Sequence, residues 1–515
     1  MESATQIWLL IWVWVVLIIP SSGISPFNPA MRQTAIAHTI YNSYSYVAEA
    51  SRCGAPRCGR PSKRPSKRAK QGSISRGFDP GSRGFGRPSP AASKLPIPAS
   101  PPEGPEWRAF ESWLVERGAH LNGVELADCG EGLRGLRTTK ACNRGDELIR
   151  IPRSLILDTK RADARLGALW ADGPPLPRYA KLALLVLLEQ QLGPTSDVAP
   201  YIEILPTPAD FEAEGGPTTL WTKEELEVAE CPKLSTDAVM RYERWASSPV
   251  LEHDAFAAGW RALGLDGAAP SKAQLRWAVA AVTSRAYGAV DSDGSQASLL
   301  IPMVDMANHQ HPPNTAKGLE EDGQHFVVIA TQPLPKGAQV FLSYGALPNI
   351  VLLSQFGFML SAISQDYAIV DCAHLKEAEP TAALEAVEQG LLMRDADGTI
   401  STWQPAGPQL RAALTLLAER DALPAQLLQQ ACHTGGGTAA SIPTGTIAYA
   451  TMIKRTLSRF STTIAQDRAA LKDVSLAPRA RLALRFRIEQ QVILNRELAS
   501  QGMQAKAHAT SKLQT

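Results

Sequence analysis

The order in which two hydrophobic periodicities follow one another is the feature that most constrains the fold. Short apolar alternations separated by Gly and Asn-Arg-Gly breaks occupy residues 123–158, and they are typical of small strands joined by turns. Apolar residues at helical spacing then dominate up to residue 286. Short strands return between 298 and 345, and helical spacing resumes from 375 to about 500. Strands and helices do not alternate singly, so there is no signature of a parallel sheet. The sequence predicts an α+β chain: a β-rich domain with a helical insert, then an all-α C-terminal lobe.

The first 104 residues differ in composition from the rest of the chain. Residues 1–30 contain an apolar run of 13 residues, Ile7–Ile19. This run is shorter than the roughly 20 residues of a membrane-spanning helix and is typical of a signal peptide. Residues 31–104 are rich in Arg, Lys, Ser, Gly and Pro. Such a segment buries too little apolar surface to fold, so we expect it to be disordered.

This two-part leader resembles the bipartite transit peptide of proteins imported into complex plastids, because transit segments share its composition. We therefore expect the protein in the chloroplast. Two alternatives remain open. One is a membrane anchor formed by Ile7–Ile19 and followed by a basic linker, and the other is a nuclear-localisation patch in "GRPSKRPSKRAK" (59–70).

The charge and the cysteine content exclude some functional classes. The formal net charge of the 515 residues is +2, so the composition does not favour a nucleic-acid partner. The seven cysteines are odd in number and scattered, which is not the pattern of a disulfide framework. Cys53 and Cys58 are a weak zinc candidate, because no second pair follows at ligand spacing. We expect no metal ion, no nucleic-acid partner and a monomer.

The stretch "LLIPMVDMANHQHPPN" (299–314) ends an apolar run in a group of polar residues. His309 and His311 would face the same side of a strand, but no third ligand follows at fixed spacing, which disfavours a metal. Asn308 offers both donors and acceptors and suits a ligand with an ammonium group and an adenine. His311 precedes two prolines and is expected in a turn. From these residues alone, a cofactor site, a structural turn and a metal site remain open.

Four motifs in one order resemble the SET-domain protein methyltransferases, in particular the plant Rubisco large-subunit lysine methyltransferases. They are "GLRGLRTTKACNRGDELIRIP" (132–152), "SRAY" (284–287), "LLIPMVDMANH" (299–309) and "VFLSYGALPNIVLLSQFGF" (340–358). Each motif is weak alone, and their common register makes the resemblance specific. The implied divisions are a SET domain with a knotted strand arrangement at 105–372, its helical insert at about 158–290, a helical substrate-binding lobe at 373–500 and a tail at 501–515.

The resemblance implies that the chain binds S-adenosylmethionine. Gly132, Leu133 and Arg134 would contact its methionine part through the main chain, since glycines let the backbone approach a ligand closely. Arg285 would pair with its carboxylate, because the planar guanidinium binds carboxylates with two parallel hydrogen bonds. The other residues expected at the cofactor are Asn308, His309, Tyr344, Phe356 and Phe358.

Tyr344 of "FLSYG" stands where the family carries its catalytic tyrosine. Methyl transfer from a sulfonium to a neutral nitrogen is an in-line displacement. The site must therefore align the two atoms and stabilise the transferred methyl group with oxygen dipoles. The resemblance implies that the Tyr344 hydroxyl supplies one of these dipoles. An apolar pocket would help to deprotonate an acceptor lysine, because burial disfavours the charged amine.

The expected substrate side departs from the lysine-methylating pattern. Phe356 stands where the subfamily carries a second tyrosine, Phe326 aligns with a substrate-side tyrosine, and Ala289 replaces a polar residue. Asp305 would either orient the substrate pocket or cap the knot. The expected substrate-binding residues are Asp305, Phe326, Tyr344 and Phe356.

The resemblance predicts a protein-lysine N-methyltransferase that uses S-adenosylmethionine. Its partner would be a protein substrate, for example a plastid protein such as the large subunit of Rubisco. Protein histidine methylation and a non-catalytic binding module are the alternatives.

Overall fold

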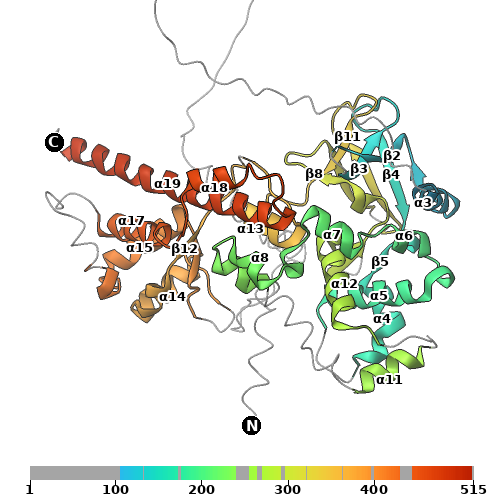
Figure 1. Ribbon diagram of the computed structural model, residues 1–515, viewed down its shortest axis with the longest axis horizontal. Helices are drawn as coiled ribbons and strands as arrows, with labels where there is room; N and C mark the ends of the chain where they lie inside the picture. The colour runs from blue at the N-terminus through green and yellow to red at the C-terminus, as the bar shows by residue number, and fades with distance from the viewer. Residues whose placement is uncertain are drawn as a thin grey trace, which may run out of the picture.

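The computed structural model describes residues 105–130, 133–171, 176–238, 254–263, 269–290, 296–320, 322–361, 363–395, 399–427, 429 and 443–512. The predicted leader and transit segment, Cys53, Cys58, Gly132 and the loop at 435–441 lie outside these residues. Within them, no helix is both long and apolar enough to cross a membrane. Figure 1 shows strands gathered at one end of the molecule and a helical lobe at the other, with the long helix α19 (Pro478–Lys512) running from the C-terminus towards the middle.

The β-rich domain consists of small sheets, as the short alternations predicted. One sheet has the strand order β1-β4-β10-β9, a second β2-β3-β11-β8 and a third β5-β7-β6. The strands are β1 (His120–Leu121), β2 (Val124–Asp128), β3 (Arg134–Thr138), β4 (Glu147–Pro152), β5 (Leu157–Asp158), β6 (Tyr287–Val290), β7 (Gln296–Leu300), β8 (Asn308–His309), β9 (Thr315–Leu319), β10 (His325–Ala330) and β11 (Gln339–Leu342). Along β10, Phe326, Val328 and Ala330 face the core, as a period of two requires. Helix α3 (Pro105–Glu116) precedes β1 and packs on it.

Two segments far apart in the sequence interlock at one edge of the second sheet. β8 pairs in parallel with β11, so that His309 lies beside Leu342. The Asn314 side chain donates to the Gln339 carbonyl and accepts from the Phe341 amide, both at 2.8 Å. The loop after β8 is thereby fastened across β11. This is the knotted arrangement expected from the sequence, and it brings the ends of β8 and β11 together.

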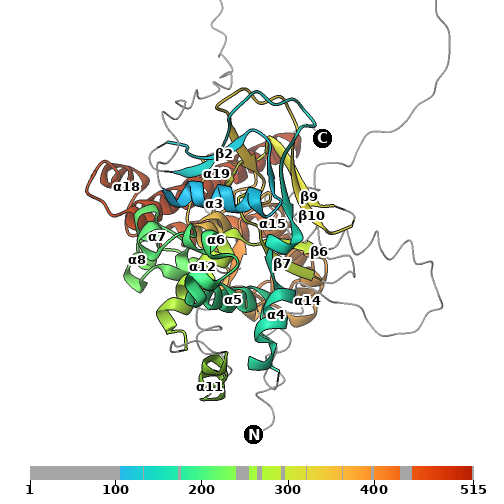
Figure 2. The same cartoon turned by 90° about the vertical axis from the view of Figure 1, so that its right-hand side faces the viewer.

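The helical insert lies between β5 and β6. Its helices are α4 (Thr159–Leu166), α5 (Arg178–Leu192), α6 (Ala199–Glu203), α7 (Pro208–Glu214), α8 (Lys223–Glu227), α11 (Asp254–Ala262) and α12 (Lys272–Arg285). Figure 2 shows β2, β9 and β10 above α4, α5 and α12. A capping box at Ser271 and Gln274 starts α12. The helical spacing in the sequence continued to residue 286. The helix ends at Arg285, because Tyr287 pairs with Leu299 and begins β6.

The C-terminal lobe is helical apart from one short strand. Its helices are α14 (Pro380–Glu388), α15 (Pro408–Glu419), α17 (Thr444–Leu457), α18 (Ile464–Ala470) and α19. Strand β13 (Trp403–Pro405) pairs antiparallel with β12 (Ile369–Asp371), which follows the β-rich domain. The lobe has a core of its own, to which α15 contributes Leu414, α17 contributes Tyr449 and α19 contributes Leu494.

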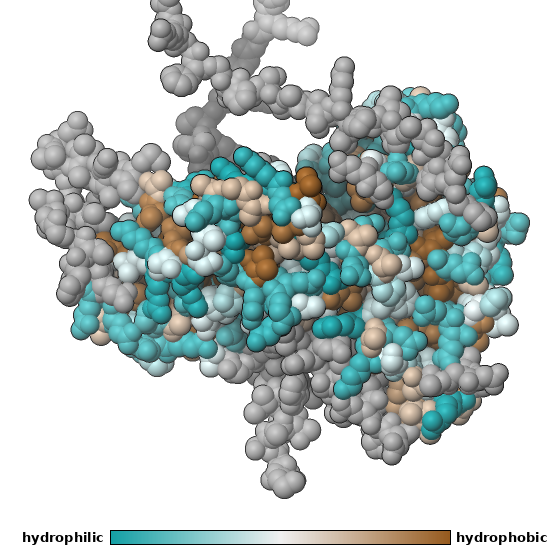
Figure 3. Space-filling view, in the orientation of Figure 1, coloured by the Kyte–Doolittle hydropathy of each residue, from teal (hydrophilic) through white to brown (hydrophobic). Residues whose placement is uncertain are grey.

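A separate apolar cluster joins the two lobes. It contains Trp221 and Leu226 of the insert, Leu353 from the end of the β-rich domain, and Leu482 and Phe486 of α19. α19 also packs on α7 and α8, which lie beside it in Figure 1. Elsewhere, the face in Figure 3 shows apolar residues interspersed with hydrophilic ones. The lobes therefore share a buried core.

Candidate functional site

Tyr344 follows β11 directly and lies in the middle of an aromatic group. Its hydroxyl donates to the Ala307 carbonyl at 2.8 Å, and its amide donates to His309 Nδ1 at 3.0 Å. Its ring centroid lies 5.0 Å from that of His309 and 4.8 Å from that of Phe356. Phe358 meets Tyr344 edge-on at 6.4 Å. Burial raises the pKa of Tyr344 to about 12, so the hydroxyl keeps its proton at neutral pH.

A close contact between two glycines sets the positions of the two phenylalanines. Helix α13 (Asn349–Val351) continues into the π-helical turn η7 (Leu352–Phe356), which Gly357 ends with a φ of 79°. A Cβ at Gly357 would lie 2.3 Å from the backbone of Gly216 in the insert. Only glycine fits this left-handed position and this approach. The insert therefore presses on the segment that carries Phe356 and Phe358.

His309 is a neutral imidazole in this setting. Burial lowers its pKa to about 4, far below neutral pH. Because Nδ1 accepts from the Tyr344 amide, the neutral ring carries its proton on Nε2. That Nε2 is buried and has no hydrogen-bond partner in the described part of the chain. It is therefore a donor available to a ligand.

Asp305 is buried in a polar group beneath the aromatic residues. Its Oδ2 accepts from the Tyr201 hydroxyl at 2.8 Å and lies 3.7 Å from Arg285 Nη1. Arg285 Nη1 also donates to the Asp305 carbonyl at 2.9 Å. Burial raises the pKa of the Asp305 carboxyl, and the charge of Arg285 opposes this. Asp305 Oδ1 and Arg285 Nε are buried with no partner among the described residues.

A second guanidinium lies close to Arg285. The pKa of Arg134 is lowered by burial and by the positive charge of Arg285. The Arg134 carbonyl accepts from Asn308 Nδ2 at 2.9 Å. A Cβ at Gly135 would lie 2.7 Å from that same Nδ2, so glycine allows β3 to approach Asn308. Leu133, just before β3, is 47% exposed.

These groups fit S-adenosylmethionine. Two adjacent guanidiniums, one with a free buried donor, suit the carboxylate of its methionine part. Unpartnered atoms of Asp305 and His309 offer an acceptor and a donor to its polar groups. Buried polar atoms without partners are rare in folded proteins, and several of them in one place indicate a ligand site. The structure brings together all of the predicted cofactor residues that it describes except Leu133, for which it shows only exposure.

The expected substrate side contains two residues that the sequence analysis missed. Tyr287 lies on β6, and its hydroxyl is 3.3 Å from the Val304 carbonyl. Phe326 is only 4% exposed and packs behind Tyr287, with the ring centroids 6.1 Å apart. Lys317 Nζ lies 3.7 Å from the centre of the Tyr287 ring. Tyr287 stood in the quoted "SRAY" motif and could have been found. Lys317 carried no signal, because its contact depends on the strand register.

Lys317 has an unusual environment for a lysine. Burial lowers its pKa to about 7, from the ordinary value of 10.5. The positive charge of Lys317 contributes to the low pKa of His309, after burial and the charge of His311. Tyr344 in turn raises the pKa of Tyr287, although burial is the larger cause. The Lys317 amine therefore lies within electrostatic range of the residues that surround Tyr344.

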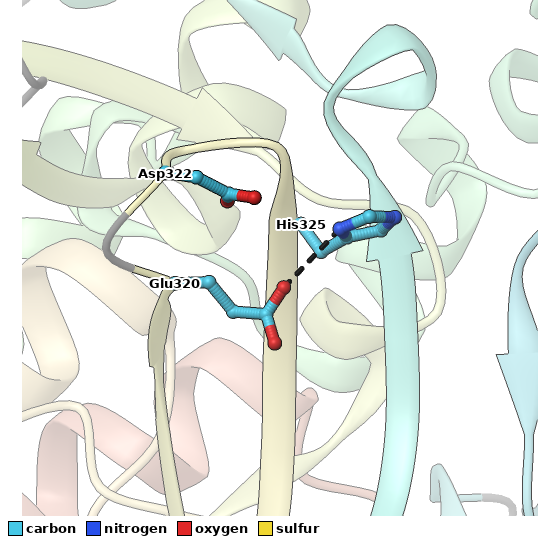
Figure 4. A group of neighbouring side chains, drawn as sticks. All are labelled: Glu320, Asp322 and His325. Carbon is cyan, nitrogen blue, oxygen red and sulfur yellow. Dashed lines mark ion pairs between the residues drawn. The ribbon is translucent and has the colours of Figure 1, made fainter.

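A group of possible metal ligands lies at the turn between β9 and β10. Figure 4 shows Glu320, Asp322 and His325, with ligand atoms within 4.8 Å of one another. His325 Nδ1 lies 3.2 Å from Glu320. Both oxygens of Glu320 already accept from Arg150 at 2.8 Å. Because Arg150 neutralises the central carboxylate, we interpret the group as an ion-pair network.

A large cavity lies elsewhere, at the joint between the lobes. Its volume is about 990 Å³, and its walls include Trp221, Leu226, Trp403 and Phe460. None of the predicted site residues lines it. The chemistry-bearing residues are thus separate from this cavity.

Comparisons with known proteins agree with this arrangement. The SET domain family matches residues 133–345, and the Rubisco LSMT substrate-binding family matches residues 447–494. Actin-histidine N-methyltransferase from Homo sapiens is 26% identical over 430 residues, which are 77% of this chain and 70% of that protein. The Mus musculus protein is 26% identical over 419 residues, 75% of this chain and 67% of that protein.

Solved structures share the fold. The SET domain of LSMT bound to lysine and AdoHcy has a TM-score of 0.54 and 19% identity, over 78% of this chain and 92% of that one. Rubisco LSMT bound to AdoMet has a TM-score of 0.52 and 20% identity, over 78% of this chain and 93% of that one.

Proposed function

From the premise that the chain is a SET-domain protein methyltransferase that uses S-adenosylmethionine, we propose that it methylates the side-chain nitrogen of a lysine in another protein. The observation that carries the choice of lysine is the state of an amine at this site. Lys317 Nζ lies over the Tyr287 ring, and burial lowers its pKa to about 7. An acceptor lysine must arrive as a neutral amine, so a pocket that depresses the pKa of an amine serves this reaction.

The residues of the site divide the work. Bound S-adenosylmethionine supplies a methyl group activated by a sulfonium. Arg285 and Arg134 would hold its carboxylate, and Asn308 would fix the cofactor beside β3. The only hydrogen of the Tyr344 hydroxyl is committed to the Ala307 carbonyl. Its lone pairs are therefore free to face the polarised methyl group.

The positions of these groups have to be held to a fraction of an ångström for in-line transfer. His309 fixes the backbone of Tyr344 through Nδ1, and Phe356 packs against its ring. Phe358 closes the edge of the same ring. These apolar faces keep water away from the amine, which favours its neutral form.

Histidine is the second candidate acceptor. The relatives found by sequence include actin-histidine N-methyltransferases. Phe356 offers no second hydroxyl beside the amine, and an imidazole is already neutral near pH 7. We prefer lysine to histidine as the acceptor because the site lowers the pKa of an amine. An imidazole acceptor does not need such a shift to be neutral.

One experiment separates the two acceptors. The purified chain is incubated with deuterated-methyl S-adenosylmethionine and a plastid extract, and the heavy methyl groups are located by mass spectrometry. We expect them on lysine side chains of other proteins. Heavy methyl groups on histidine alone would transfer the proposal to the second candidate. A Tyr344→Phe sample, matched in concentration, identifies the labelling that depends on this site.

We also propose a plastid address and a plastid protein substrate, such as the large subunit of Rubisco. The support is the two-part composition of residues 1–100, with an apolar run followed by a basic, acid-poor segment. Residues 1–100 fused to a fluorescent protein should reach a plastid and be cleaved. An uncleaved membrane protein at another location would favour an anchor at Ile7–Ile19.

A further inference from the structure

Lys317 stands on the inward face of a strand. β9 pairs with β10 so that Lys317 lies opposite Val328, which is fully buried. Thr315, two residues earlier on the same face, is also buried, whereas Ala316 between them is exposed. Lysine is rarely placed in such a row, because its charge has to leave water. The inward position of its amine therefore calls for a compensating interaction or a functional role.

No carboxylate explains this position. Within the described part of the chain, Lys317 has no acid within ion-pair distance, and its nearest recorded contact is the face of Tyr287 at 3.7 Å. Lys181 provides the comparison. It lies 5.5 Å above the Trp170 ring, but it also forms an ion pair with Asp163 at 2.6 Å. The aromatic face alone holds the Lys317 amine, as an acceptor lysine would be held.

The same amine is linked to the predicted catalytic tyrosine through His309 and Tyr287. The charge of Lys317 reaches His309, and the His309 ring stacks on Tyr344 with centroids 5.0 Å apart. Tyr287, whose ring lies against the amine, is within electrostatic range of Tyr344. The titratable groups within range of Lys317 thus include Tyr287 on β6 and His309 on β8.

We propose that Lys317 is an internal methyl acceptor of this enzyme, which its own chain presents to the methyl group of S-adenosylmethionine. The inference rests on the proposed lysine specificity. The lone pair of neutral Lys317 Nζ forms the new nitrogen–carbon bond as the carbon–sulfur bond breaks. The electron pair of that bond passes to sulfur, which leaves as S-adenosylhomocysteine. The methylammonium then releases one proton to water. The flexible four-carbon stem allows the amine to move from Tyr287 towards Tyr344.

Isotope transfer tests the proposal without any other substrate. The full chain, at several concentrations, is incubated with deuterated-methyl S-adenosylmethionine, digested and analysed by mass spectrometry. We expect heavy methyl on Lys317, at a first-order rate that does not depend on protein concentration. Lys181 should stay unlabelled, and Lys181→Arg should not alter the labelling of Lys317. Tyr344→Phe should slow the labelling about a hundredfold or more, the usual effect of deleting such a stabiliser.

A second readout needs no cofactor. Trace acylation with acetic anhydride across a pH series reports the pKa of each lysine, because only neutral amines react. The profile of Lys317 should have its midpoint near pH 7, well below the ordinary value of 10.5. An ordinary lysine profile at position 317 would contradict the proposal.

The outcomes distinguish this inference from the proposed function. An unlabelled Lys317 in a preparation that binds S-adenosylmethionine overturns the inference. If that preparation still labels lysines of other proteins, only the inference fails. If it labels histidines alone, lysine specificity fails as well. Labelling of Lys317 that accelerates with protein concentration would show transfer between copies, and would exclude an internal acceptor.

Discussion

The candidate site and the joint between the lobes bury polar groups in opposite ways. At the joint, Asp467 is 1% exposed and accepts hydrogen bonds from Arg487, Thr462 and Gln491. Arg487 is 7% exposed and also donates to Glu230 at 2.7 Å. Both charges are compensated by partners from α18, α19 and the insert.

At the candidate site, comparable burial is left uncompensated. Asp305 Oδ1, Arg285 Nε and His309 Nε2 are all enclosed and have no partner in the described residues. An unmet buried donor or acceptor costs stability, typically about 1–3 kcal/mol. The two regions therefore use their buried polar groups differently. At the joint these groups pair with one another and hold the lobes together, whereas at the candidate site they are unpaired and can bind a ligand.

The largest effect should come from breaking the joint. Arg487→Met leaves Asp467 buried without its countercharge, so the free energy of unfolding should fall by about 3–5 kcal/mol. Urea unfolding followed by circular dichroism measures this loss. Arg485, which is exposed on the same helix, supplies the control, and Arg485→Met should change little. A small loss for Arg487→Met would show that the network is not what fastens the lobes.

The motifs predicted the architecture of the site better than that of the joint. Asn308, His309 and Tyr344 stand in short quoted motifs, so their convergence could be predicted once the family resemblance was recognised. The contact between Arg487 and Glu230 spans 257 residues and depends on how α19 lies on the insert. No local sequence pattern predicts a contact between residues so far apart in the chain.

The substrate side shows the same limit at closer range. Phe326 was expected on the substrate side, and the register of β10 leaves it 4% exposed and packed against Tyr287. Lys317 faces inward because β9 pairs with β10 in one register and not the next. A shift of one residue in the pairing of β9 with β10 would have exposed Lys317. This register cannot be predicted from the sequence of one strand alone.

The second prediction tests whether the site stabilises a transition state rather than the fold. Tyr344→Phe removes one oxygen and keeps the ring stacked on His309. Turnover on an identified substrate should fall about 10²–10³-fold, with cofactor affinity and unfolding midpoint nearly unchanged. Single-turnover kinetics and calorimetry measure the two quantities. Turnover close to that of the wild type would return Tyr344 to a structural role.

The third prediction concerns the unmet donors of Arg285. Arg285→Ala should lower the affinity for S-adenosylmethionine about ten- to a hundredfold, since a charge-assisted hydrogen bond contributes about 1.5–3 kcal/mol. Isothermal titration calorimetry measures the change. Arg150→Ala removes a guanidinium outside the site and should leave affinity unaltered. Equal effects of the two substitutions would mean that Arg285 acts only through folding.

The smallest expected effect isolates the cost of burying the Lys317 amine. The folded chain releases this proton near pH 7, whereas the unfolded chain keeps it up to the ordinary value of 10.5. Between those values the unfolded state binds more protons, so the wild-type chain gains stability as pH rises. Methionine does not titrate. Lys317→Met should therefore raise the free energy of unfolding by about 1 kcal/mol near pH 7, a value discounted because the amine is partly exposed and its contact with Tyr287 is lost.

The advantage of Lys317→Met should shrink towards about pH 10, and urea unfolding across a pH series measures the trend. His309 does not interfere, because its pKa of about 4 lies below this range and its ordinary value below neutral pH. Lys181→Met is the matched control. It loses an ion pair with Asp163, and should be neutral or slightly destabilising at neutral pH. If Lys317→Met destabilised the chain equally at every pH, the amine would be a structural contact of Tyr287. The substrate side would then resemble the joint, where buried charges are compensated, and not the rest of the candidate site.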